Sequence, residues 1–104
     1  MVELEGQGGL MAEKLSKKAV SDALANVDGW ALDDGKLRRD FMFANFVDAF
    51  AFMTKAAIEA EKMNHHPEWF NIYSKVTVHL TTHSVGGISE LDFQLAKIMN
   101  QLAE

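Results

Sequence analysis

Residues 61–73 read EKMNHHPEWFNIY, and this stretch decides how the chain is organised. Pro67 cannot continue a helix, and it favours extended backbone for the residue directly before it. The helix that enters this stretch should therefore end near Asn64, which leaves His65 and His66 in the turn that follows. The sequence thus predicts a helix, a turn that carries two histidines, and a strand, in this order.

Two further polar residues lie at the ends of predicted elements. A strand over residues 75–82 places His83 just past its end. The spacing from Ser89 to Asp92 is that of a capping box, which places Asp92 in the first turn of a final helix. Side chains at the ends of rigid elements are where a shared pocket is usually built. We expect one pocket to collect His65, His66, His83 and Asp92.

Histidine is the residue whose ordinary pKa, about 6.5, lies nearest neutrality. Several histidines with nearby carboxylates therefore make a set that can transfer protons. Two other interpretations stay open. A His-His-Pro turn is also typical of a capped helix end. The second interpretation is a zinc site, because three histidines and a carboxylate can bind zinc. Against it, the sequence has no cysteine and no His-Glu-x-x-His pair. The zinc ligands would be Glu61, His65, His66 and His83.

The order of these residues resembles the signature of the pterin-4a-carbinolamine dehydratases. The matching positions are Glu61, His65-His66-Pro67, Tyr73, His83 and Asp92. The surrounding sequence is similar too, at residues 29–30, 50–54, 60–62, 67–71 and 87–90, so the resemblance covers roughly residues 15 to 103. One departure is Asn64, which is often an aspartate in the animal members. The amide keeps the hydrogen-bonding capacity and removes a charge beside the site.

The resemblance implies dehydration of 4a-hydroxytetrahydrobiopterin to the quinonoid dihydropterin, in tetrahydrobiopterin recycling. It implies that His65 and His83 form the acid/base pair, that His66 binds the substrate, and that Glu61 and Asp92 orient or polarise the histidines. The residues expected to line the pterin are Asn64, His65, His66, Thr81, Thr82 and His83. We expect no cofactor and no metal ion.

The resemblance also implies partners. Subunits would pair through sheet edges into a homodimer, and animal members pair dimers through helices into a homotetramer. The animal members are also known as the dimerisation cofactor of a homeodomain transcription factor. A non-enzymatic interaction module with a transcription-factor partner is therefore the second function that stays open.

Composition narrows the classes of protein. The chain has 104 residues, of which 48% are hydrophobic and 24% charged, which is typical of one globular domain. No apolar run approaches the length of a membrane span, no signal-peptide layout opens the chain, and there is no cysteine. We expect a cytoplasmic protein, with a nuclear location also open. The net charge of −5 argues against direct nucleic-acid binding.

Hydrophobic periodicity predicts the remaining elements. We expect residues 1–14 to be a disordered tail and residues 15–104 to be the domain. The predicted elements are a helix at 17–26, strands at 30–32 and 36–43, a helix from Asn45 to about Asn64, strands at 69–73 and 75–82, and a helix after Ser89. The order α-β-β-α-β-β-α predicts an α+β fold with a four-stranded antiparallel sheet covered by helices.

The long helix has an unusually wide apolar arc. Its polar strip holds only Asp48, Lys55, Glu59 and Lys62. One apolar stripe consists of Phe46, Phe50, Met53, Ala57 and Ile58, and it is extended by Ala49, Phe52, Ala56, Ala60 and Met63. Either the helix is deeply buried in its own domain, or part of the arc contacts another subunit. Glu61 lies on the apolar side, either as a boundary residue or beside the histidine turn.

Overall fold

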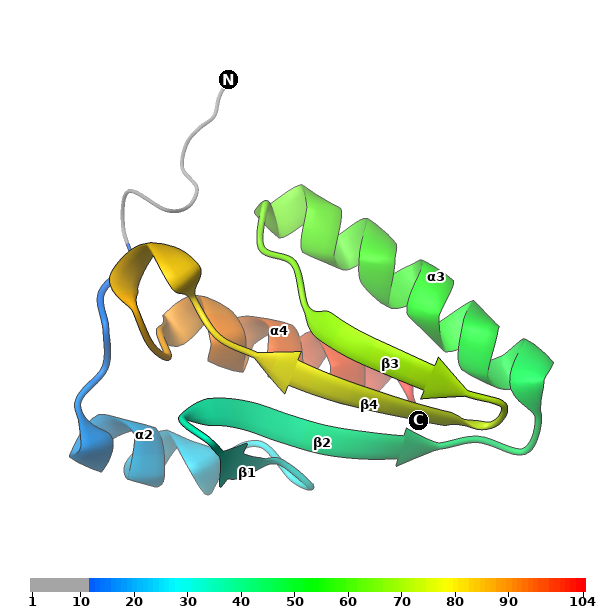
Figure 1. The fold of residues 1–104 in the computed structure, drawn as a ribbon, viewed down its shortest axis with the longest axis horizontal. Helices are drawn as coiled ribbons and strands as arrows, with labels where there is room; N and C mark the ends of the chain where they lie inside the picture. Colours follow the sequence, from blue (N-terminus) through cyan, green and yellow to red (C-terminus); the bar gives the residue numbers. More distant parts are fainter. Residues whose placement is uncertain (1–11) are drawn as a thin grey trace.

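The computed structural model describes residues 12–104. Its elements, in chain order, are α2 (Lys17–Leu24), β1 (Ala31–Asp33), β2 (Lys36–Met42), α3 (Phe46–Met63), β3 (Glu68–Ile72), β4 (Lys75–Leu80), the 3-10 helix η2 (His83–Val85) and α4 (Glu90–Leu102) (Figure 1). This order confirms the predicted α+β fold. Residues 1–11 of the predicted tail lie outside the described residues. Residues 12–14, the rest of that tail, have no regular secondary structure.

The strands form one antiparallel sheet in the order β1-β2-β4-β3. Val76, Val78 and Leu80 of β4 are buried on one face, and Leu37 and Phe41 of β2 share that face. The helices supply most of the rest of this core, and α4 passes behind the sheet in Figure 1. The alternate side chains of the same strands therefore lie on an open face.

Arg39 interrupts the apolar face of β2, and its side chain both packs on an aromatic ring and makes hydrogen bonds. Its guanidinium carbon lies 4.4 Å from the centroid of the Phe41 ring. Its Nη1 donates to the Asp28 carbonyl and to the Asn100 side chain, which also accepts from the indole of Trp30. A delocalised cation stacked on a ring costs little to place beside a core. The arginine therefore ties α4 to β2.

Helix α3 has two apolar faces with different surroundings. It begins where the Asn45 side chain accepts from the Asp48 N–H. The residues buried against the core are Ala49, Phe52, Ala56 and Ala60. Phe46, Phe50 and Ile58 remain exposed at 48%, 56% and 53%. Burial of the whole arc within its own domain is therefore wrong for these three side chains, and contact with another subunit stays a prediction.

Several predicted boundaries are wrong by a residue or two. Helix α2 ends at Leu24 rather than at residue 26, and β2 ends at Met42. Trp30 precedes β1 because its N–H donates to the Val27 carbonyl, and pairing with β2 begins at Ala31. Strand β4 ends at Leu80 because Thr82 pairs instead with Gly87 in an isolated bridge.

Hydrophobic spacing predicts a buried stripe on α4 made of Leu91, Leu95, Ile98, Met99 and Leu102, and the structure buries a somewhat different face. Leu95 and Met99 are buried as expected, and Phe93 and Ala96 are buried with them. Leu91 was expected in the buried stripe and instead borders a surface cavity. No helix in the described part of the chain combines the length and apolar character needed to cross a membrane.

Candidate active site

The chain reverses at the C-terminus of α3, and the turn carries two histidines. Asn64 has left-handed backbone angles, φ 51 and ψ 42, and its N–H donates to the Ala60 and Glu61 carbonyls. The N–H of His65 also donates to the Ala60 carbonyl, at 3.0 Å. These bonds satisfy the helix end in the way a left-handed cap does. The predicted helix end near Asn64 is confirmed.

His65 is buried and is held by a buried carboxylate. Its Nε2 lies 2.6 Å from Asp92 Oδ1, and the two side chains are 8% and 0% exposed. The other oxygen, Asp92 Oδ2, accepts from the Thr82 hydroxyl at 2.8 Å and from the Ser89 N–H at 2.9 Å. Because both carboxylate oxygens are occupied, Asp92 is held in one orientation and so is the imidazole.

The same carboxylate also begins α4. Ser89 and Asp92 form the predicted capping box, in which Asp92 accepts from the Ser89 backbone. The Ser89 hydroxyl lies 2.7 Å from the Thr82 hydroxyl and accepts from the Leu91 N–H. A helix cap therefore fixes the position of the group that holds His65. The Asp92 side chain therefore both caps α4 and contacts His65.

His66 points outward from the same turn. Its Nε2 lies 2.8 Å from Glu61 Oε1, and both side chains are exposed. An exposed pair of this kind contributes little to stability, about 0–1 kcal/mol. It does restrict the orientation of the imidazole. Of the two interpretations of Glu61, the structure agrees with the one that places it beside the histidine turn.

His83 lies just past β4, as predicted, and has a partner that the sequence did not reveal. Its Nε2 lies 3.1 Å from Glu68 Oε2, while Glu68 Oε1 accepts from Lys36 Nζ at 2.7 Å. The Lys36 ammonium lowers the pKa of Glu68 below its ordinary value; partial burial raises it, and His83 lowers it further. Glu68 therefore stays a carboxylate at neutral pH.

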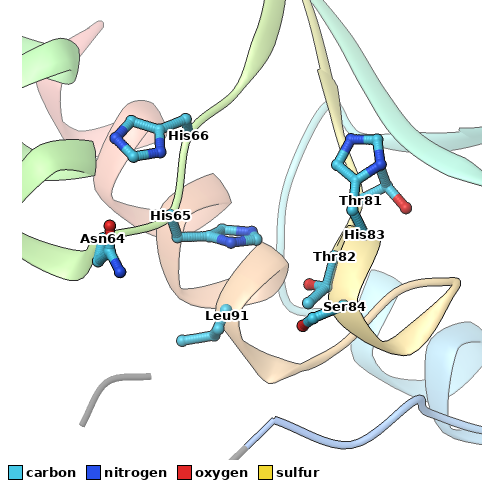
Figure 2. A pocket seen from close by; sticks show the side chains of 8 residues that line it. All are labelled: Asn64, His65, His66, Thr81, Thr82, His83, Ser84 and Leu91. Atoms are coloured by element: carbon cyan, nitrogen blue, oxygen red, sulfur yellow. The ribbon is translucent and has the colours of Figure 1, made fainter. Parts of the chain in front are cut away.

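These segments surround one surface cavity of about 310 Å³, shown in Figure 2. Its lining consists of Asn64, His65, His66, Thr81, Thr82, His83, Ser84 and Leu91. All six residues predicted to line the substrate are present, and Ser84 and Leu91 were not predicted. In Figure 2 the imidazole of His65 points toward the segment that carries Thr82 and His83. Glu61 and Asp92 lie outside the lining and contact His66 and His65. Catalytic and binding roles for these residues stay predictions.

The fourth histidine lies elsewhere. His79 is on the open face of the sheet, with its Nε2 3.0 Å from Asp33 Oδ2. A shallow cavity of about 440 Å³ borders it, but the charged Arg38 in that cavity is paired with Asp33 and Asp40. The smaller cavity is the better site because three histidines line it.

The zinc interpretation is not supported by the geometry. Within residues 12–104, no group of three or more His, Cys, Asp or Glu side chains is placed to hold a metal ion. Each histidine of the cavity instead contacts one carboxylate. The candidate ligands Glu61, His65, His66 and His83 therefore do not form a metal centre in this structure.

The chain matches known proteins over most of its length. Residues 13–102 match the family described as pterin 4 alpha carbinolamine dehydratase. A protein of Rhizobium johnstonii is 56% identical over 93 residues, which covers 88% of this chain and 92% of that protein. A protein of Solibacter usitatus is 52% identical over 93 residues, covering 89% and 98%. Both carry the name "Putative pterin-4-alpha-carbinolamine dehydratase".

The fold also has a solved counterpart. A crystal structure described as "transcriptional coactivator/pterin dehydratase from Brucella Melitensis" superposes with a TM-score of 0.86 at 46% sequence identity. The match covers 88% of this chain and 100% of the Brucella chain.

Proposed function

The chain belongs to the pterin 4 alpha carbinolamine dehydratase family, and we propose that it dehydrates a 4a-hydroxytetrahydropterin to the quinonoid dihydropterin and water. The observation that supports this most directly is one cavity lined by His65 and His66 and by His83 from a separate segment of the chain. The names of relatives that are more than half identical support the same reaction.

The reaction needs two proton transfers at adjacent atoms. A donor protonates the hydroxyl on C4a, which then leaves as water. An acceptor takes the proton from N5 while the double bond between C4a and N5 forms. Imidazole can serve in either role near neutral pH and contributes about 10²–10⁴-fold in each. We assign the two roles to His65 and His83, which reach the cavity from different elements.

The other lining residues hold the substrate in this proposal. His66 binds it, oriented by its bond to Glu61. Asp92 orients His65 from behind. The side chains of Asn64, Thr81 and Thr82 offer hydrogen bonds to the polar edge of a pterin, and Leu91 offers an apolar contact to its ring. No cofactor enters the reaction.

The physiological substrate in this proposal is the carbinolamine of tetrahydrobiopterin. The reaction would then belong to tetrahydrobiopterin recycling, and we place it in the cytoplasm. Comparing the biopterin carbinolamine with a pterin that lacks the dihydroxypropyl side chain tests this assignment. A higher kcat/KM for the biopterin form is expected, and a preference for the truncated pterin would contradict it.

A carbinolamine dehydration assay tests the proposed reaction. The 4a-hydroxytetrahydropterin dehydrates slowly without a catalyst, so conversion is followed by absorbance with and without the full chain. We expect a rate well above the spontaneous one in the presence of the protein. A rate equal to the spontaneous one would remove the proposed function.

An interaction module is a second candidate, and the exposed apolar face of α3 favours it. Phe46, Phe50 and Ile58 lie on this helix and none of them lines the cavity. Partner binding and dehydration could therefore coexist in one chain. Phe50→Glu separates them, because it should weaken binding at α3 and leave the dehydration rate unchanged.

A further inference from the structure

His83 differs from His65 in how its ring is held. The side chain of His65 is 8% exposed, whereas that of His83 is 79% exposed. The ring of His83 therefore has little packing to select its orientation. Its hydrogen bond to Glu68 is the contact that does so.

Glu68 is placed firmly enough to act as this anchor. It is the first residue of β3, paired with His79 of β4, and it follows Pro67 directly. Its second oxygen is held by Lys36, the first residue of β2. Two regular strands therefore fix the carboxylate between an ammonium and the imidazole.

We infer that Glu68, held by Lys36, is a positioning residue that sets the tautomer of His83, with the ring proton on Nε2 and the lone pair on Nδ1. A carboxylate has only acceptors, so the nitrogen that faces it must donate. Neutral imidazole has one N–H, so Nδ1 is left as the acceptor. A glutamate is ordinarily ionised at a pH where histidine is neutral, and Lys36 lowers the pKa of Glu68 further.

This arrangement selects the atom that exchanges the proton. When His83 is neutral, Nδ1 can accept a proton from the substrate. When His83 is protonated, Nε2–H still faces Glu68 and Nδ1–H can be donated. The consequence for catalysis rests on the proposed function, while the tautomer of His83 does not.

Glu68→Gln tests the inference with almost no change of shape. The Lys36 ammonium has only donors, so it should take the amide oxygen. The amide NH₂ then faces Nε2 of His83, which must become an acceptor. The ring proton should therefore move to Nδ1.

Nitrogen-15 NMR of the imidazole rings reads the tautomer directly, because protonated and unprotonated ring nitrogens have well-separated shifts. Spectra of the full chain are recorded at about pH 8.5, where histidine is ordinarily neutral, and His83→Gln assigns the signal. We expect Nε2–H in the wild type and mainly Nδ1–H in Glu68→Gln. Nδ1–H in the wild type, or the same tautomer in both proteins, would overturn the inference.

Two further variants sharpen the test. Glu59→Gln removes an equal charge from the surface of α3 and should leave the His83 signal unchanged. In Lys36→Met with Glu68→Gln the amide is free to turn its oxygen toward His83, so Nε2–H should return. Loss of the Nε2–H tautomer in this double variant would contradict the part assigned to Lys36.

Kinetics test the catalytic consequence separately. Glu68→Gln should lower kcat about ten-fold with KM changed less than about two-fold, while Glu59→Gln keeps both. An altered tautomer with unchanged kcat would overturn the positioning role. If the wild type has no dehydratase activity, the proposed function fails, and the NMR result still decides the tautomer.

Discussion

Each histidine of the cavity contacts one carboxylate, and the pairs differ in burial. The pairs are His65–Asp92, His66–Glu61 and His83–Glu68. Only the first is buried. Leaving a buried group without its partner costs about 1–3 kcal/mol, whereas an exposed pair contributes about 0–1 kcal/mol. Changes to the exposed pairs should therefore affect orientation with little effect on folding.

Removing either proposed proton-transfer group should slow turnover. His65→Ala and His83→Ala should each lower kcat about ten-fold or more, because each removes one proton transfer. If the two groups act as a unit, the double variant should lose less than the product of the single losses. Steady-state kinetics on the carbinolamine measures all three.

The chain offers a matched control for these variants. His79 is a histidine on the open face of the sheet and does not line the cavity. His79→Ala should therefore keep kcat within about two-fold of the wild type. Circular dichroism confirms that the variants fold. Near-wild-type turnover in both His65→Ala and His83→Ala would remove the proposed mechanism.

The sequence reveals a site residue when the signal for its position is local. Pro67 and the Ser89 cap place His65, His66 and Asp92 at element ends by rules that need only neighbouring residues. Glu68 has no such signal. Its partners are 32 and 15 residues away, and only the pairing of strands brings them together. The bond between Glu68 and His83 therefore could not be predicted.

Helix α3 shows what periodicity can and cannot predict. Residue spacing predicts the wide apolar arc, and the predicted helix ends at Asn45 and Asn64 agree with the caps of α3. Periodicity could not say which part of the arc meets the sheet. That depends on the position of β4 and α4, which is set by contacts distant in sequence. The structure assigns Ala49, Phe52 and Ala56 to the core.

In the sheet, too, pairings between neighbouring strands can be predicted from the sequence, and pairings between distant strands cannot. The hairpins β1–β2 and β3–β4 follow from short turns, at Asp34-Gly35 and Tyr73-Ser74. The pairing of β2 with β4 spans α3, and no turn signal predicts it. The strand order β1-β2-β4-β3 therefore could not be predicted from the sequence, whereas the fold class could.

The cap of α3 allows backbone and substrate effects to be separated. Asn64 has positive φ, which glycine adopts without steric cost and a β-branched residue does not. Asn64→Gly should change the free energy of unfolding by less than about 0.5 kcal/mol, while Asn64→Val should cost about 1–2 kcal/mol. Urea unfolding measures both. A larger loss in the glycine variant than in the valine variant would contradict the cap assignment.

The same glycine variant tests the cavity. Asn64 lines it, so removing the amide should raise KM several-fold while the helix end is preserved. An unchanged KM would show that the amide does not contact the substrate.

Catalysis should need no metal ion. The three imidazoles of the cavity already face carboxylates, and proton transfer is all that the proposed reaction requires. Activity should therefore survive exhaustive chelation and dialysis, with the metal content measured on the same sample. A loss of turnover that added zinc restores would contradict this prediction.

The exposed face of α3 predicts self-association. Phe46, Phe50 and Ile58 leave large apolar areas in contact with water. Burying a side chain of this size stabilises by roughly 1.5–3 kcal/mol, so two or three of them give a strong drive to pair with a second copy. Strand β3 adds an edge of the sheet, with Phe70 and Ile72 also exposed.

We expect at least a dimer at micromolar concentration, and a tetramer if both the helix face and the sheet edge are used. Light scattering should therefore give a mass that is a multiple of 11.6 kDa. Phe50→Glu should lower this mass because it places a charge in the proposed contact. Lys55→Glu alters a charge on the polar strip of the same helix and should leave the mass unchanged. If the wild type is only monomeric at these concentrations, α3 is not a contact between copies of this chain.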